Sequence, residues 1–432
     1  MNNSLGWLTL FLTFIFILSK KKDISIFKLL FVGFYLRSSL VFLDQYFISL
    51  PGGNFDSIGY QKKAIDISNE YGLKILFNMF QEDNYLISRI ISIFYTIAAP
   101  SEMMAKAISV AIGTISIYLF YNLLLLVWNN KIIALRASWI FALMPSMCLY
   151  SSLVLREVYT TFFLIITLFP IIIFTRKMVN KKINSITWNN FSLNNHLFFI
   201  LYIFFGFYIL KYFHGAMFLG IFILIFFYLY YFFKEEFKFI RNKKAIRIKL
   251  FYVIFLLLLP IFLWISNVIK IPYIPEFGLT FNLIDILQRR FDISVINVVN
   301  GVYGSNFPSF LIPNNLIDFI PKVFMRIIYF LYSPFPWDIK RFEHLIGLLN
   351  SIILIYISIC CWFNRRKIFQ KPELKLLFLL LFSYIVIYAI GTGNFGTSIR
   401  HQTKFIFILI CLAAPKLYNF DFNLKKSSVL KK

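Results

Sequence analysis

Charged residues, and acidic residues above all, are scarce in this chain. Of its 432 residues only 19 are Asp or Glu, and charged residues of both signs make up 15% of the sequence. A soluble globular domain contains about 25% charged residues. Hydrophobic residues reach 59%, aromatic residues 20% and the mean hydropathy +0.75. This composition excludes an ordinary soluble protein and is typical of a polytopic integral membrane protein.

Cysteine and histidine are equally rare, with four residues of each. The cysteines (Cys148, Cys360, Cys361 and Cys411) all lie in apolar stretches without the spacing of metal ligands. We therefore predict that they are packing residues and form neither a disulfide nor a redox pair. The chain also lacks a recognisable soluble domain and an internal repeat, which predicts one polytopic membrane domain over residues 1–432.

Positive charge is in excess, with a formal net charge of +25. Such a value can indicate nucleic-acid binding, but here the Lys and Arg residues collect in short segments between apolar runs. These segments are Lys20 to Lys22, the loop around Lys131 and Arg136, Arg176 to Lys182, Lys234 to Lys249, Arg365 to Lys367 and the C-terminal tail. The positive-inside rule places them in the cytoplasm. The predicted partner is thus a lipid bilayer and not a nucleic acid.

The apolar runs predict an all-α bundle of about eleven transmembrane helices, each near the length that spans a bilayer. The predicted spans are 5–19, 26–43, 103–128, 132–152, 156–175, 197–213, 215–233, 250–270, 343–363, 375–391 and 402–416. Two further segments, 86–99 and 319–333, each contain an arginine and run into proline, so we predict outer interfacial or re-entrant helices. The N-terminus then lies outside, and the outer loops cover about residues 44–101, 271–342 and 391–401.

Several cations depart from the positive-inside rule. Those on the outer side are Arg89, Arg289, Arg290, Lys340, Arg341 and Arg400, and those within or at the edge of apolar helices are Arg37, Arg156, Lys211 and Lys404. A charge at bilayer depth costs roughly 2.5–3.5 kcal/mol. Each could snorkel or pair with a nearby acid such as Asp292, Asp338 or Glu343. As a set they favour an anionic ligand, and a lipid phosphate or diphosphate suits guanidinium groups.

Two acids on the outer side are candidates for chemistry. Asp56 follows a Pro-Gly-Gly turn and shares a helix face with Tyr60 and Ala64. It would either cap that helix, or accept a proton or hold a divalent metal. Glu157 opens a helix next to Arg156, and adjacent helical residues point about 100° apart, so the two do not readily pair.

The segment GTGNFG (391–396) has the G-x-G-x-x-G spacing of a dinucleotide-binding turn. That fingerprint requires a preceding strand and a following helix in a parallel sheet, whereas here it joins two apolar helices. We predict instead a tight turn that places Arg400 and Lys404 on one helix face beside His401, where an anion would bind.

The order of these features resembles the N-terminal half of the GT-C superfamily of membrane glycosyltransferases, which use polyprenyl-phosphate sugars. The resemblance covers residues 37–175 and depends on Arg37, on Asp56-x3-Tyr60-x3-Ala64, on the amphipathic segment 86–99 and on Glu157 at the second outer loop. It implies that Asp56 is a catalytic base or the ligand of a Mg or Mn ion. Many members have an adjacent acidic pair, whereas this loop has one clear acid.

Later segments extend the resemblance. Residues 329–339 (YFLYSPFPWDI) and 393–405 (GNFGTSIRHQTKF) look like parts of bacterial polysaccharide-cluster membrane proteins. The size, the helix count and the outer Arg and His residues also resemble O-antigen repeat-unit polymerases and O-antigen ligases. These resemblances imply a bacterial inner-membrane enzyme of lipopolysaccharide O-antigen synthesis, with its active site facing the periplasm. Its substrate would be an undecaprenyl-linked sugar or oligosaccharide, and a chain-length regulator would be a further partner.

In this hypothesis the site residues divide into three groups. Asp56, Glu157 or His401 accepts the proton of the acceptor hydroxyl; Tyr60, Trp337 and Asn394 contact the sugar; and the phosphate is bound by Arg37, Arg156, Arg289, Arg290, Arg400 and Lys404. A repeat-unit polymerase is the leading interpretation. The alternatives are a single-sugar transferase with a polyprenyl-monophosphate donor, a lipid-linked oligosaccharide flippase or other transporter, and a non-catalytic scaffold.

Overall fold

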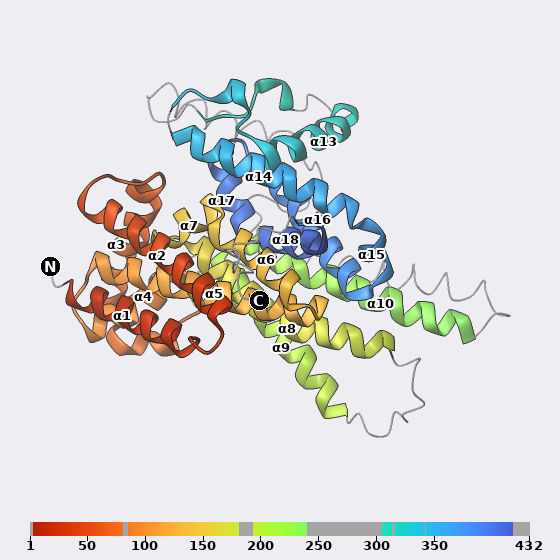
Figure 1. Ribbon diagram of the computed structural model, residues 1–432, viewed down its shortest axis with the longest axis horizontal. Coiled ribbons are helices and arrows are strands. Elements are labelled where there is room, and N and C mark those ends of the chain that lie inside the picture. The colour runs from red at the N-terminus through yellow and green to blue at the C-terminus, as the bar shows by residue number, and fades with distance from the viewer. Residues whose placement is uncertain are drawn as a thin grey trace, which may run out of the picture.

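The computed structural model of the chain describes residues 3–80, 85–180, 193–239, 305–312, 316–341 and 343–417. Over these residues the chain is helical and has no strand, which confirms the predicted all-α class. Figure 1 shows the helices gathered into one body. The predicted span 250–270 and most of the second outer loop lie outside the described residues.

The helices differ widely in length. They are α1 (Ser4–Ser19), α2 (Ile24–Tyr46), α3 (Ile58–Tyr71), α4 (Leu86–Ile97), α5 (Glu102–Trp128), α6 (Lys131–Leu143), α7 (Pro145–Ser151), α8 (Arg156–Asn180), α9 (Leu193–Phe213), α10 (Gly220–Phe239), α13 (Leu316–Tyr332), α14 (Glu343–Phe363), α15 (Arg365–Gln370), α16 (Pro372–Gly391), α17 (Phe395–Thr403) and α18 (Ile406–Ala413). Short π or 3-10 segments occupy Gly53–Ser57, Gly72–Phe77, Gly215–Leu219, Ser309–Leu311, Pro336–Asp338 and Ala414–Lys416.

Five described helices are long and apolar enough to cross a membrane, namely α2, α5, α8, α14 and α16. The pair α6 and α7 would count as a sixth span, bent by 60°. The bend lies at Met144, before Pro145 opens α7, because proline lacks the N–H needed to continue a helix but is tolerated in a first turn. The predicted span 132–152 is thus a broken helix. These apolar helices identify a membrane protein.

The predicted span 402–416 also differs from the structure, in which α17 and α18 are separate helices. The Lys404 amide bonds to the His401 carbonyl, three residues back, and the hydroxyl of Thr161 donates to the carbonyl of Thr403 at 2.9 Å. The helix is therefore interrupted at Lys404, whereas hydropathy alone predicts a continuous span with this lysine near its edge.

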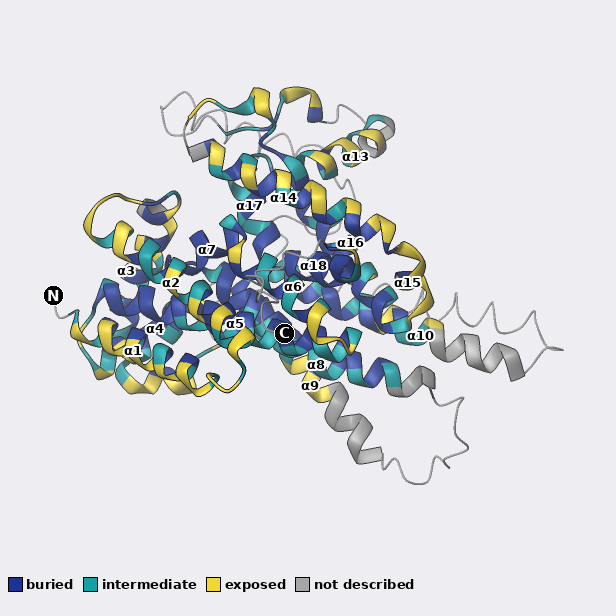
Figure 2. Cartoon of the chain, in the orientation of Figure 1, coloured by how far each residue is buried: buried dark blue, intermediate teal, exposed yellow. Residues whose placement is uncertain are grey.

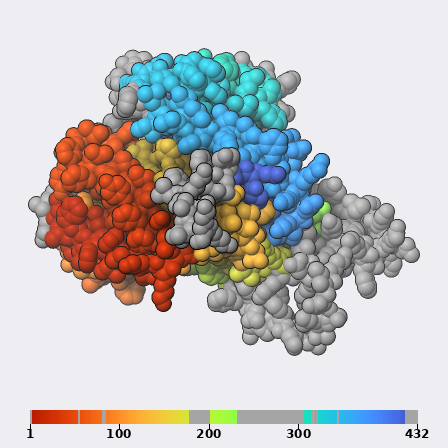
Figure 3. All heavy atoms as spheres, in the orientation of Figure 1, coloured from red at the N-terminus to blue at the C-terminus, as the bar shows by residue number. Residues whose placement is uncertain are grey.

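α5 is at the centre of the N-terminal half and contacts α1, α2, α6 and α8. Its buried side chains join a core that continues through α8 into α16 and α18 (Figure 2). In the space-filling view α13 and α14, in cyan and light blue, lie along one side of the molecule (Figure 3), and α14 contacts α7 of the N-terminal half. The two halves thus pack together over an apolar core, and both can contribute residues to one site.

Lys131 and Arg176, from two of the basic segments predicted to be cytoplasmic, lie at one end of the bundle. Lys131 lies 2.6 Å from Asp23, and Arg176 lies 2.9 Å from Glu373 while donating to carbonyls at the end of α5. These contacts join the starts of α2, α6 and α16 to the end of α5 and the C-terminal part of α8. The opposite ends of the same helices point toward α3, α7 and α17, where the predicted site residues lie.

Arg326 on α13 closes the C-terminal end of α16, just before the GTGNFG segment. Its guanidinium donates to the carbonyls of Ala389 at 3.2 Å, Ile390 at 3.1 Å and Thr392 at 2.6 Å. The last carbonyls of a helix lack intrahelical donors, and the helix dipole favours a cation there. α13, the helix predicted at 319–333, is thereby attached to α16.

We expect Arg326→Gln to destabilise the fold. Hydrogen bonds to a charged group contribute about 1.5–3 kcal/mol each, and the buried carbonyls would lose their donor. Thermal unfolding in detergent should show a lower midpoint for Arg326→Gln, whereas Arg341→Gln, which alters an exposed arginine of the same region, should leave it unchanged. Equal midpoints for both variants would contradict the assigned role.

Candidate functional site

Asp56 lies in the π-helical turn Gly53–Ser57 that precedes α3. Gly52 has a φ of +89°, a conformation that favours glycine, so the predicted Pro-Gly-Gly turn is confirmed. The N-cap of α3 is Ser57, and Asp56 does not cap the helix. Its carboxylate accepts a hydrogen bond from Arg400 Nη1 instead. The alternative that Asp56 caps the helix is therefore wrong, because its carboxylate binds Arg400 and not the backbone of α3.

Glu157, in the first turn of α8, is fully buried. Its Oε1 lies 3.3 Å from Arg400 Nη2 and 3.8 Å from Lys404 Nζ. Its Oε2 has no hydrogen-bond partner among the described residues. Arg156 does not pair with this neighbour and donates to the Phe213 carbonyl at 3.3 Å. The prediction that these adjacent residues diverge is confirmed.

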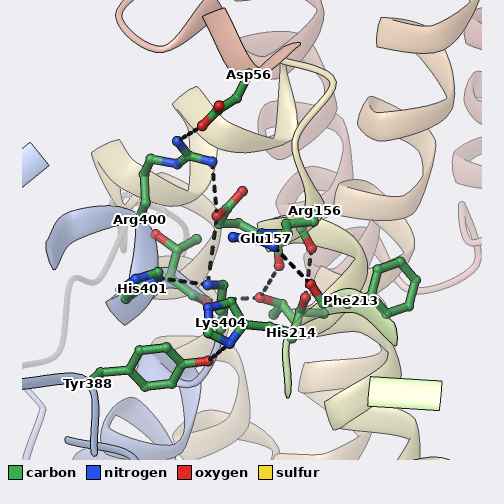
Figure 4. Close-up of polar contacts among 12 residues, drawn as sticks. Asp56, Arg156, Glu157, Phe213, His214, Tyr388, Arg400, His401 and Lys404 are labelled. Atoms are coloured by element: carbon green, nitrogen blue, oxygen red, sulfur yellow. Dashed lines mark hydrogen bonds and ion pairs between the residues drawn. The ribbon is translucent and has the colours of Figure 1, made fainter. Parts of the chain in front are cut away.

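Arg400 joins the two acids, although they lie on different helices (Figure 4). Side-chain exposure falls from 53% at Asp56 through 19% at Arg400 to 1% at Glu157 and 0% at Lys404. Burial disfavours the charge of Arg400, but the carboxylates of Glu157 and Asp56 outweigh it and raise its pKa above the ordinary value. The cluster therefore leads from an accessible carboxylate to a buried one through a guanidinium that stays charged.

Next to Glu157 the cluster continues with Lys404, the imidazole rings of His401 and His214, and the phenol ring of Tyr388. Lys404 Nζ lies 2.7 Å from His401 Nδ1, and the hydroxyl of Tyr388 lies 3.0 Å from His214 Nδ1. The His401 ring packs against both His214 and Tyr388, with centroids 5.2 and 4.6 Å apart. His214 and Tyr388 were not predicted. The rarity of histidine, together with the position of His214 at the outer end of a predicted span, is the signal that could have identified it.

A small apolar cluster holds the acids in place. It contains Leu50 from the Asp56 loop, Leu153 and Leu155 from the stretch before α8, and Ile399 from α17. In addition, the Val154 amide donates to Ser57 Oγ at 3.2 Å. Because each of these residues is adjacent or close to Asp56, Glu157 or Arg400, the packing of the apolar side chains fixes the spacing of the charged ones.

Other predicted residues lie outside this cluster. Arg37 is buried in α2 and donates to the carbonyls of Gly33 at 2.8 Å and Ala142 at 3.0 Å, so it is not placed to bind the same phosphate as Arg400. The prediction for Arg37 is corrected accordingly, because its side chain folds back into the helix bundle. Arg289 and Arg290 lie outside the described residues.

The predicted sugar-binding residues are spread along the same end of the molecule. Tyr60 lies on α3. Burial raises the pKa of its hydroxyl, and the charged groups of the cluster are close enough to affect that pKa as well. Trp337, 70% exposed, stacks on Phe335 with centroids 4.9 Å apart. Asn394 caps α17 by accepting from the Thr397 amide at 2.7 Å. Only Tyr60 is therefore near the carboxylates.

The GTGNFG segment forms no dinucleotide-binding turn. It runs from the end of α16 to α17 and pairs with residues 305–307 through the single bridge between Asn306 and Asn394. Gly393 has open space where a Cβ would stand, and neither it nor Gly396 has a positive φ. The predicted close backbone approach is thus absent at these two glycines, and the Asn394 cap sets the direction of α17.

The carboxylates do not fit a divalent metal as they stand. Asp56 Oδ2 and Glu157 Oε1 both contact the guanidinium of Arg400, whose positive charge repels a Mg or Mn ion at the same place. Among the described residues no three His, Cys, Asp or Glu side chains gather in a metal-binding group.

No family model, curated protein or solved structure matches the chain.

We expect acid to destabilise the protein partly through His401. Burial, reinforced by the Lys404 ammonium and then by His214, lowers the pKa of His401 well below its ordinary value of 6.5. Below that pH the unfolded chain binds a proton that the folded chain excludes, so stability falls as the pH falls. From pH 7 to pH 5, His401→Gln should lose less thermal stability than the unmodified protein. An unchanged acid dependence in this variant would contradict the expectation.

Proposed function

We propose that the protein is a membrane glycosyltransferase that uses a polyprenyl-phosphate- or diphosphate-linked sugar donor. The observation that carries this proposal is the pairing of one guanidinium, Arg400, with an accessible acid, Asp56, and a buried acid, Glu157. A base that water can reach, beside a cation suited to phosphate, supplies the two groups that glycosyl transfer needs.

The orientation of the site supports a lipid-linked donor. The cluster lies at the end of the bundle opposite to the contacts of Lys131 and Arg176. If those basic segments face the cytoplasm, as the positive-inside rule predicts, the site opens on the outer side of the membrane, away from nucleotide sugars. A GT-C-like bundle of about eleven spans in a bacterial inner membrane, with a periplasmic active site, is part of the same proposal.

In this mechanism the donor phosphate competes with Asp56 for Arg400. Once Arg400 binds the phosphate, the Asp56 carboxylate loses its ion-pair partner and is free to accept a proton. It then accepts the proton of the acceptor hydroxyl while the hydroxyl oxygen bonds to the anomeric carbon and the bond from that carbon to the phosphate oxygen breaks. Arg400 stabilises the negative charge that grows on the leaving phosphate. Glu157 keeps Arg400 and Lys404 in place.

A repeat-unit polymerase of O-antigen-type polysaccharide is the form of this function that we favour. A diphosphate leaving group can be stabilised by cationic side chains without a metal, and the cluster offers Arg400, with Arg156 next to Glu157. A single-sugar transferase with a monophosphate donor would use the same Asp56 and Arg400, so the assay below includes both donors.

We expect Asp56→Asn to lower the rate of chain extension by about 10²–10⁴-fold, because the general base is lost. Arg400→Ala and Glu157→Gln should lower the rate as strongly, because the phosphate-binding guanidinium is removed or loses its buried partner. The purified protein is incubated with undecaprenyl-diphosphate repeat units or a polyprenyl-monophosphate sugar, with and without chelator, and lipid-linked products are sized.

The control is Asp23→Asn, which removes an acid of the opposite end that pairs with Lys131. It should keep full activity while the three site variants lose theirs at equal expression. Full activity in Asp56→Asn, Glu157→Gln and Arg400→Ala would refute the assigned site.

A further inference from the structure

A second charged network lies on the N-terminal side of the site, around Lys106 near the start of α5. The residue is 1% exposed. Its Nζ lies 2.7 Å from Asp44 Oδ2, 2.6 Å from Glu102 Oε1 and 3.1 Å from Gln45 Oε1. An ammonium has three N–H donors, and here each can reach an acceptor. The charge of Lys106 is thus fully compensated, although the side chain is buried.

Asp44, at the end of α2, carries this network into the loop that precedes Asp56. Its Oδ2 faces Lys106, while its Oδ1 accepts a hydrogen bond from the Leu50 amide at 2.6 Å. A Cβ at Gly53 would stand 3.2 Å from the same Oδ1, so the carboxylate packs directly against the backbone where the π-helical turn begins. One carboxylate therefore holds both ends of the Leu50 to Gly53 turn.

The Asp56 segment has a second attachment on its other side. Ser57 Oγ accepts from the Val154 amide at 3.2 Å, which joins the segment to the stretch before Glu157. Asp56 lies between these two attachments and is itself about half exposed. Its position relative to Arg400 is therefore set at one end by Val154 and at the other end by the Lys106 and Asp44 pair.

We propose that Lys106 and Asp44 are positioning residues that hold Asp56 within reach of Arg400. A role for Asp56 in the reaction rests on the proposed function, whereas the geometry rests on the contacts alone. Without Lys106, Asp44 becomes a buried carboxylate that lacks its cation, which is strongly unfavourable. Asp44 can avoid this cost by turning toward water, and the Leu50 amide and the Asp56 loop are then released.

A thiol at position 56 measures this position without any assay of activity. The four native cysteines are buried, so a maleimide should label Asp56→Cys selectively. Arg400 beside the thiol favours the thiolate, which is the reactive form. If Lys106→Met lets the loop move away from Arg400, the thiol pKa rises and labelling near neutral pH becomes several-fold slower.

The control variants separate position from general damage. In the Asp56→Cys background, Lys106→Arg should preserve the labelling rate, as should Lys62→Met, which alters an exposed lysine of α3. An unchanged rate in Lys106→Met would overturn the proposal. If that variant does not fold, Asp44→Ala combined with Lys106→Met removes both charges and the Leu50 acceptor, and the same slowing is expected of it.

A double-mutant cycle then connects position with the reaction. Lys106→Met should lower kcat for glycosyl transfer severalfold, but it should add nothing to the loss already caused by Asp56→Asn. It should lower the thermal midpoint equally in both backgrounds. A loss of activity that is the same in both backgrounds would show a purely structural role. Full activity of Asp56→Asn by itself would refute the proposed function, and the labelling rates would still decide the positioning.

Discussion

The simultaneous pairing of Arg400 with Asp56 and Glu157 is the contact on which the site depends. An exposed ion pair contributes at most about 1 kcal/mol, so the Asp56 part by itself would stabilise little. Glu157 is different, because a buried carboxylate must be compensated or the fold loses several kcal/mol. Arg400 supplies that compensation together with Lys404. The start of α8 and the whole of α17 are therefore tied to each other by the cost of burying charge.

This arrangement also allows another anion to take the place of Asp56 beside Arg400. Glu157 cannot leave Arg400 without a large desolvation cost, whereas Asp56 can exchange its guanidinium for water. A phosphate that approaches Arg400 thus competes with the weaker of two partners. Arg400 can thus stay paired with the buried Glu157 while it exchanges the exposed Asp56 for a ligand. This suits a site that binds an anionic headgroup and frees a base in the same step.

Several features of the fold and the site were predictable because they depend on local sequence. Apolar runs identify α2, α5, α8, α14 and α16, and the Pro-Gly-Gly turn before Asp56 follows from residue types. The divergence of Arg156 and Glu157 follows from helix geometry. Arg37 was misplaced because an arginine in an apolar helix can either face a ligand or bind carbonyls of its own bundle, as it does here.

The sequence by itself determined the membrane class and the candidate charged residues, because hydropathy and charge add up residue by residue along the chain. Only the tertiary structure decided that Arg400 meets Asp56 and Glu157, 344 and 243 residues away. It also decided that His214 and Tyr388 lie beneath them and that the last apolar run breaks at Lys404. Such contacts depend on which helices pack together and how far each is displaced along its axis. That choice is made by the fit of apolar surfaces over the whole bundle, and no short stretch of sequence contains it.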